Sequence, residues 1–177
     1  MNKERIIFLT GSTGLVGSYL LKDLIENGNR VYAVARGDSL GNVKERVLKL
    51  LRFWNSNLPE EKLRNLIVID GDITKPNLGI NSERILEEIR SEVEIIFHSA
   101  ALAKFRVDLD SIRIINVDGT KNVLDFALNL KRIRKINYIS TAYVIGNKGL
   151  FSFEERMLSE GQNFNNSYEQ SDRKSVV

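Results

Sequence analysis

Cysteine is absent from the 177-residue sequence, and histidine occurs once, as His98. The absence of cysteine excludes a disulfide scaffold, a zinc site built on thiolates and a cysteine nucleophile. A single histidine excludes a metal site with several histidine ligands and argues against a Ser-His-Asp triad. We therefore expect no metal site, and we interpret His98 as structural rather than catalytic. The length lies within the roughly 100–200 residues typical of one domain, which predicts a single domain over residues 1–177.

The sequence also has little excess of either charge, since 26 Lys and Arg stand against 23 Asp and Glu, for a net charge of +3. This excess is too small to indicate nucleic-acid binding. The basic residues Lys131, Arg132, Arg134 and Lys135 follow a predicted helix, where cations complement the helix dipole. No apolar stretch approaches the roughly 20 residues that a membrane span needs. We expect a cytoplasmic protein with no membrane span and no nucleic-acid partner.

Short runs of apolar, often β-branched residues alternate with longer helical patterns along the chain. This alternation predicts right-handed βαβ units, and strands that are apolar throughout indicate a parallel sheet covered on both faces. The predicted fold class is α/β, a three-layer doubly wound parallel sheet, and such sheets bind ligands at the carboxyl ends of their strands. The predicted strands are Ile6–Leu9, Val31–Val34, Leu66–Ile69, Ile95–Phe97 and Ile136–Ile139, and the predicted helices are Leu15–Glu26, Val43–Trp54, Ile85–Ile89 and Ile112–Leu130.

Three glycines, Gly11, Gly14 and Gly17, lie between the first predicted strand and the first predicted helix. Gly11 permits a tight turn, Gly14 leaves the backbone open to a pyrophosphate, and Gly17 lets the helix pack closely. The N–H groups at the start of the helix then face the phosphates. The alternative is a glycine-rich turn without a ligand. The placement of the glycines within a repeated strand–helix pattern favours dinucleotide binding.

The segment Thr10-Gly11-Ser12-Thr13-Gly14-Leu15-Val16-Gly17 resembles the signature of the extended short-chain dehydrogenase/reductase superfamily. The resemblance continues in Gly71-Asp72-Ile73, His98-Ser99-Ala100-Ala101, Asn116-Val117-Asp118-Gly119-Thr120 and Ser140-Thr141-Ala142-Tyr143. Within the superfamily these motifs look most like the thioester reductase and fatty acyl-CoA reductase branch, and the sugar-nucleotide epimerase/dehydratase branch comes next. The resemblance implies an NAD(P)-binding Rossmann domain of an oxidoreductase with a small-molecule substrate. The implied cofactor contacts in this segment are Gly11, Ser12, Thr13, Gly14, Leu15, Val16 and Gly17.

The end of the second predicted strand bears on the choice of nicotinamide cofactor. Relatives that use NAD carry an acid where this sequence has Ala35, and Arg36 follows that position. An arginine fork can grip the 2′-phosphate of NADP with two hydrogen bonds, so we expect NADP. The alternatives are a solvated surface arginine, and NAD binding through Asp38 if the loop folds back.

Residues after the next two strands have roles implied by the resemblance. Asp72 and Ile73 would flank the adenine, with Asp72 meeting its exocyclic amine; the alternative is an acid that caps a turn. Ala100 and Ala101 would leave room for the cofactor, or would only pack at the strand end. Asn116 lies within a predicted helix, where it matches an asparagine that supports the active site or is an exposed polar residue.

The resemblance also implies a catalytic pair. Thr141 matches a Ser/Thr that hydrogen-bonds the substrate oxygen, and Tyr168 matches a tyrosine that acts as general acid/base. In the superfamily a lysine one helical turn later lowers the pKa of this tyrosine, but this sequence has Asp172 at that position. Lys174 could substitute only outside a helix, because residues six apart on a helix face different ways. The alternative for Tyr168 is a surface tyrosine.

The family continues past residue 177 into a lobe that binds substrate, so we expect a chain truncated before that lobe. Its last residues, 172–177, do not resemble the helix of the family. We therefore predict that the chain binds NADP weakly and turns over no substrate. The alternatives are a fragment of a sugar-nucleotide epimerase/dehydratase, a non-catalytic nucleotide-binding module and a ligand-free remnant. The long predicted helix could also form a homodimer interface, as it does in relatives.

Overall fold

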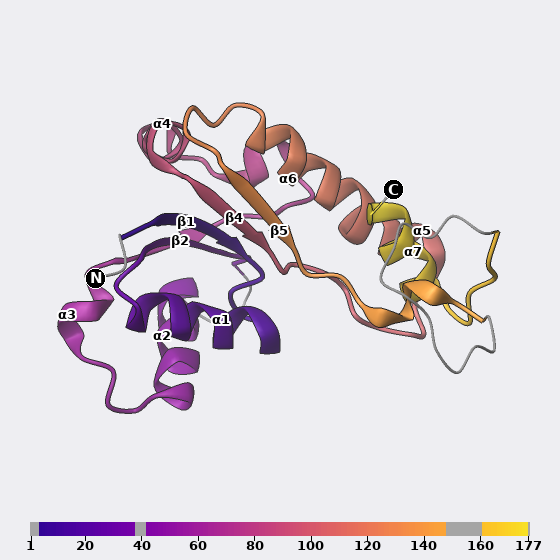
Figure 1. Ribbon diagram of the computed structural model, residues 1–177, viewed down its shortest axis with the longest axis horizontal. Helices are drawn as coiled ribbons and strands as arrows, with labels where there is room; N and C mark the ends of the chain where they lie inside the picture. The colour runs from indigo at the N-terminus through magenta and orange to yellow at the C-terminus, as the bar shows by residue number, and fades with distance from the viewer. Residues whose placement is uncertain (1–3, 38–41, 148–160, 177) are drawn as a thin grey trace.

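Five strands form the centre of the fold (Figure 1). They are β1 (Ile6–Thr10), β2 (Arg30–Ala35), β3 (Leu66–Asp70), β4 (Ile95–His98) and β5 (Lys135–Tyr138). The computed structural model describes residues 4–37, 42–147 and 161–176. The strand order is β3-β2-β1-β4-β5, and every neighbouring pair is parallel. The chain moves outward from β1 in one direction and then returns to add β4 on the other side, which confirms the predicted doubly wound sheet.

Helices cover both faces of this sheet. Helices α1 (Leu15–Glu26) and α2 (Val43–Trp54) lie below it in Figure 1, and α4 (Glu83–Glu92) and α6 (Gly119–Ala127) lie above it. Within the described residues, none of the helices combines the length and the apolar character needed to cross a membrane. The remaining elements are α3 (Glu60–Leu63), the 3-10 turn η1 (Pro76–Gly79), α5 (Leu109–Arg113), the π-helical turn η2 (Ile114–Asp118), the 3-10 turn η3 (Ala142–Ile145) and α7 (Ser167–Val176).

Each face of the sheet has its own apolar core, because successive strand residues point to opposite faces. In β1, Phe8 packs toward the face of α4 and α6, whereas Ile7 and Leu9 pack toward the face of α1 and α2. All three side chains are at most 2% exposed. This arrangement explains why the predicted strands are continuous apolar runs rather than alternating ones.

One prediction about the second half of the chain is wrong in detail. The long helix predicted over Ile112–Leu130 begins earlier, contains the π-helical turn η2, and ends at Ala127. The last segment forms the helix α7 through Val176. Position 174 therefore lies six residues after Tyr168 within one helix, and the condition under which Lys174 could substitute for the expected lysine, a segment that is not helical, is not met.

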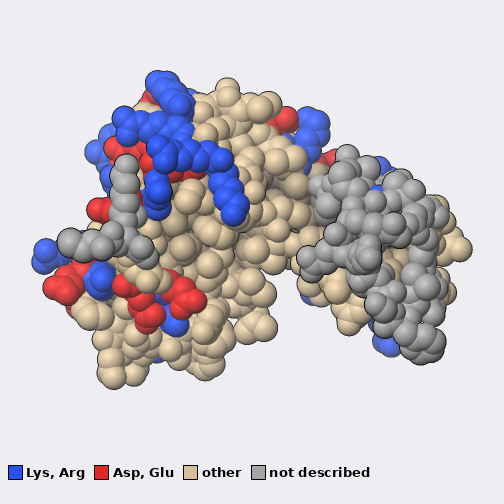
Figure 2. Space-filling view, viewed as in Figure 1, with Lys and Arg blue, Asp and Glu red and all other residues tan. Residues whose placement is uncertain are grey.

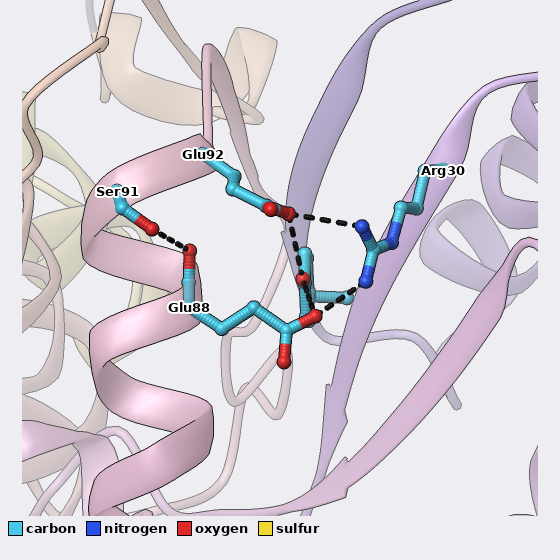
Figure 3. Close-up of polar contacts among 5 residues, drawn as sticks. Arg30, Glu88, Ser91 and Glu92 are labelled. Atoms are coloured by element: carbon cyan, nitrogen blue, oxygen red, sulfur yellow. Dashed lines mark hydrogen bonds and ion pairs between the residues drawn. The ribbon is translucent and has the colours of Figure 1, made fainter.

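A polar cluster clamps the start of β2 to α4 on the face of the sheet (Figure 3). Arg30 donates to Glu92 at 2.9 Å and also to Glu88. The hydroxyl of Tyr32, whose side chain is fully buried, donates to Glu88 at 2.6 Å. Burial and the hydrogen bond to Glu88 raise the pKa of Tyr32, so its hydroxyl stays protonated and remains a donor.

Candidate functional site: a cleft at the carboxyl ends of the strands

Two glycines of the turn between β1 and α1 lie in close contact with the backbone of neighbouring segments. Gly11 has a φ of +73°, and a Cβ there would lie 2.6 Å from the amide nitrogen of Ala100. A Cβ at Gly17 would lie 2.1 Å from the carbonyl oxygen of Gly11, so the first turn of α1 packs directly on the glycine turn. Gly14 is the N-cap of α1 and supplies no side-chain cap. The first N–H groups of α1 therefore stay available, as a phosphate-binding helix start requires.

A cleft of about 270 Å³ opens at the carboxyl ends of β1 to β4. The glycine turn forms one wall, and the segments that follow β2, β3 and β4 form the others. The predicted cofactor residues that line it are Gly11, Thr13, Gly14, Arg36, Asp72, Ile73, Ala100 and Ala101. The cleft lies where a doubly wound sheet binds its ligands, and the cofactor contacts of these residues remain predictions.

The other predicted residues of the glycine turn lie outside the cleft wall. Ser12 is fully buried, and its hydroxyl donates to the carbonyl oxygen of Val34 at 2.9 Å, which ties the turn to β2. Leu15 and Val16 are 75% and 52% exposed on the first turn of α1. Their side chains therefore face solvent, and their contacts with a cofactor remain predictions.

Two arginines meet at the end of β2, and sequence reasoning identified only one of them. Arg36 lines the cleft, and Nη1 of Arg46, from α2, donates to the carbonyl oxygen of Arg36 at 3.1 Å. The carboxylate of Asp70, at the end of β3, accepts the N–H of Gly37 at 2.7 Å, which holds the backbone next to Arg36. The sequence does not mark Arg46 as a site residue, because it is one of several charged residues on an amphipathic helix. Asp38, on which the NAD alternative rests, lies outside the described residues.

The segment after β3 is held in place from two sides. Oδ1 of Asp72 accepts the N–H of Thr74 at 2.9 Å and its hydroxyl at 2.8 Å, so this acid does cap a turn while it lines the cleft. Burial alone would raise the pKa of Asp72, but the hydrogen bonds from Thr74 and the charge of Arg36 hold it below its usual range. Asn122 of α6 donates to the carbonyl oxygen of Ile73 at 2.8 Å. The position of Ile73 is thereby set from α6, which sequence reasoning missed.

His98 connects β1, β4 and α6 through hydrogen bonds in the interior. Its Nε2 lies 3.0 Å from Oγ1 of Thr120, and its Nδ1 lies 2.6 Å from Oγ1 of Thr10. The Thr120 hydroxyl donates to the carbonyl oxygen of Asn116 at 2.6 Å, so it accepts from Nε2–H, and Nδ1 accepts from the Thr10 hydroxyl. The Thr10 oxygen accepts the N–H of Ala100 at 3.3 Å. Burial lowers the pKa of His98 to about 4, so this histidine is neutral and structural.

The side chain of Asn116 ties the cleft wall to α7. It lies in the π-helical turn η2 and is 1% exposed, which excludes the alternative of an exposed helix residue. Its Oδ1 accepts the N–H of Leu102 at 2.7 Å, and its Nδ2 donates to Oγ of Ser171 at 3.0 Å. Leu102 lines the cleft and Ser171 lies in α7 with Tyr168. Asn116 therefore sets the position of Tyr168 relative to the cleft.

The structure brings the hydroxyls of Thr141 and Tyr168 close enough for Thr141 to lower the pKa of Tyr168. Asp172 lies one turn after Tyr168, is 1% exposed, and accepts the hydroxyls of Ser140 and, at 2.8 Å, of Tyr138. Burial and the charge of Asp172 raise the pKa of Tyr168, and the nearby hydroxyl of Thr141 offsets this only in part. Tyr168 therefore stays protonated at neutral pH, when it can donate a proton but is a poor base.

The basic residues that follow α6 lie at the opposite end of the sheet from the cleft. Lys131, Arg132, Arg134 and Lys135 are at or just before the start of β5, whereas the cleft is at the strand ends. Figure 2 shows Lys and Arg side chains gathered over the end of the molecule where α4 lies in Figure 1. Arg134 reaches Glu94 at 3.9 Å. This group takes no part in the cleft.

A family model of NAD-binding domains, described as male sterility protein, matches residues 9–175. The chain belongs to the male sterility protein family. The match begins in β1, includes the glycine turn and the whole cleft lining, and ends within α7. The expected branch, that of fatty acyl-CoA reductases and thioester reductases with an NAD(P)-binding Rossmann domain, is thereby confirmed.

Relatives of this male sterility domain include much longer proteins. Fatty acyl-CoA reductase wat of Drosophila melanogaster is 28% identical over 176 residues, which are 96% of this chain and 34% of that protein. The NRPS-like oxidoreductase fscA of Fusarium equiseti is 32% identical over 138 residues, 78% of this chain and 13% of that protein. The terminal R domain from the myxalamid PKS-NRPS biosynthetic pathway superimposes with a TM-score of 0.84 at 29% identity, over 99% of this chain and 45% of that one. The chain thus spans about a third of the fatty acyl-CoA reductase and less than half of the R domain.

Proposed function

We propose that residues 1–177 form one NADP-binding domain of a reductase that delivers hydride to an acyl thioester or a related carbonyl. We propose further that this chain binds NADP without turning over substrate. The observation that supports the cofactor assignment is the placement of two arginines at the end of β2. Arg36 lines the cleft, and the guanidinium group of Arg46 donates to the backbone carbonyl oxygen of Arg36. Both side chains would bind a 2′-phosphate at this end of the cleft.

The cleft fits a dinucleotide in two further respects. Gly11 has a positive φ and its backbone packs against that of Ser99 and Ala100, so only glycine fits at the tight turn that forms this wall of the cleft. The start of α1 offers backbone N–H groups to the pyrophosphate, and Asp72 and Ile73 line the side assigned to the adenine. When bound, NADPH supplies the hydride. The chain itself would bind the phosphates, orient the adenosine and hold the carbonyl oxygen between the hydroxyls of Thr141 and Tyr168.

The proposal that this chain does not turn over rests on Asp172. A carboxylate stands where a lysine would lower the pKa of Tyr168, and its charge raises that pKa instead. The carboxylate is buried and accepts two hydroxyl donors, so it is built into the packing of α7. Reduction of an aldehyde or thioester by the purified chain would overturn this part of the proposal.

Calorimetric titration with NADP, NAD, 2′-phospho-ADP-ribose and ADP-ribose tests the cofactor assignment. We expect the phosphorylated ligands to bind more tightly, and Arg36→Ala and Arg46→Ala each to weaken them by about tenfold, as expected for one charge-assisted contact of about 1.5 kcal/mol. Arg52→Ala is the matched control, because Arg52 lies on the same helix but pairs with Glu60 at 3.6 Å. Equal affinity for NAD and NADP would remove the role of both arginines. Binding of none of the four ligands would favour a ligand-free remnant.

We also propose a small-molecule substrate, a cytoplasmic location and a homodimer through the long helix. Leu124 on α6 is 44% exposed and Leu128, directly after the end of α6, is 85% exposed, which supports a partner surface. Sedimentation equilibrium of the chain and of its Leu128→Glu variant tests the dimer. We expect the variant to be monomeric, and a natural chain that is itself monomeric at high concentration would refute the dimer.

A further inference from the structure

Three aromatic rings converge beside the hydroxyl pair of Thr141 and Tyr168. Phe105, in the segment after β4, lies 5.9 Å from Tyr168 and 6.2 Å from Tyr143 of η3, measured between ring centroids. Both contacts are edge-on, with interplanar angles of 68° and 86°. Such contacts are the preferred geometry of aromatic pairs, so the three rings support one another.

Two of these rings are open to solvent, although they are large and apolar. Phe105 is 56% exposed and Tyr143 is 55% exposed. The backbone of Tyr143 is anchored, because its N–H donates to Oγ1 of Thr141 at 3.3 Å. The main chain that carries the Tyr143 ring is therefore held next to Thr141.

The rings lie where they would contact the group attached to the carbonyl carbon of a substrate. Leu102 lines the cleft, and Phe105 follows three residues later along the same segment. Because the rings of Phe105 and Tyr168 are in contact, a carbonyl held at the hydroxyls of Thr141 and Tyr168 would have its attached group on the side where Phe105 lies. Phe105 has no polar atom with which to satisfy a sugar hydroxyl, whereas a hydrocarbon chain gains by covering its exposed face.

We propose that Phe105 and Tyr143 form the binding surface for the apolar acyl group of a thioester substrate, next to the reacting carbonyl. This inference rests on the proposed function, because it takes the hydroxyl pair as the site of the carbonyl oxygen. The inference predicts an order of affinity: a thioester with a long acyl chain binds more tightly than one with a short acyl chain, and both thioesters bind more tightly than a sugar nucleotide. Coverage of the two half-exposed rings by a hydrocarbon chain corresponds to about tenfold in affinity.

The test measures binding to the chain saturated with oxidised NADP, so that no hydride is available. The probes are the octanoyl and acetyl thioesters of N-acetylcysteamine, with a UDP-sugar as the third ligand, and the readout is titration calorimetry. We expect the octanoyl thioester to bind about tenfold more tightly than the acetyl thioester. Phe105→Ala and Tyr143→Ala should each reduce this ratio to about threefold or less, and Tyr143→Phe, which keeps the ring, should retain it.

Phe53→Ala is the matched control. Phe53 is 75% exposed, but it packs against Trp54 on α2 and not beside the hydroxyl pair, so its loss should leave the ratio unchanged. Unchanged NADP affinity in each variant shows that the variant is folded. A natural chain that binds both thioesters equally, binds neither, or prefers the UDP-sugar would overturn the inference, as would a ratio that survives Phe105→Ala. Failure of NADP binding would instead count against the proposed function.

Discussion

Protonation of His98 is expected to destabilise the folded chain as the pH falls. Burial lowers the pKa of His98 from 6.5 to about 4 in the folded chain, and the unfolded chain regains the ordinary value. Between these two values the unfolded chain binds a proton that the folded chain does not. The stability contributed by the neutral histidine is therefore complete above about pH 6.5 and is lost as the pH falls toward about 4. The full loss is about 3 kcal/mol, of which about 2 kcal/mol falls between about pH 7 and pH 5.

The assay is urea unfolding followed by circular dichroism at a series of pH values. Because His98 is the one histidine in the 177 residues, His98→Gln removes every imidazole from the chain. The variant should be less stable at neutral pH, since Thr10 and Thr120 lose their shared partner, but its stability should change little between about pH 7 and pH 5. The reasoning is refuted if the natural chain and the variant lose the same free energy over that interval.

Three further predictions concern the glycine turn, the clamp on β2 and the acid in α7. Gly17→Ala places a Cβ 2.1 Å from a backbone oxygen and should destabilise the chain by about 3 kcal/mol in thermal unfolding, whereas Gly14→Ala, with its nearest atom at 3.4 Å, should change stability by less than about 1 kcal/mol. Tyr32→Phe removes the hydroxyl that joins β2 to α4 and should lower the unfolding free energy in urea by about 1–2 kcal/mol. Asp172→Asn removes a negative charge, so the pKa of Tyr168 should fall in a spectrophotometric tyrosinate titration; an unchanged or higher pKa would contradict the role given to that charge.

The layers of the fold were predictable because they follow from local patterns. Buried parallel strands must be apolar on both faces, and the run Ile6–Leu9 shows this without any tertiary information. Amphipathic helices alternate with these apolar strands, and crossover connections between parallel strands are right-handed, so the pattern predicts a parallel sheet with helices on both faces. The segment Ser167–Val176 was missed because its residues are mostly polar, and its helix depends on contacts from Asn116 and Val107 that are far away in the sequence.

The candidate site was predictable only where a motif marks it. The glycine turn and Arg36 follow a strand end, which is a recognisable position. Arg46 and Phe105 have no such mark, because a lone arginine on a helix and a lone phenylalanine in a loop are common surface residues. Their proximity to the end of β2 and to Tyr168 exists only after distant segments pack together.

The sequence by itself determined the strand–helix order, the glycine turn, the family, and the presence of Asp172 where the superfamily has a lysine. These properties are local, since each depends on residues close together along the chain. Only the tertiary structure decided that His98 joins three elements, that Asn116 ties Leu102 to α7, and that Asp172 is buried under two hydroxyl donors. Those contacts join residues separated by long stretches of chain. Their energies depend on burial and direction, which no linear pattern of residues specifies.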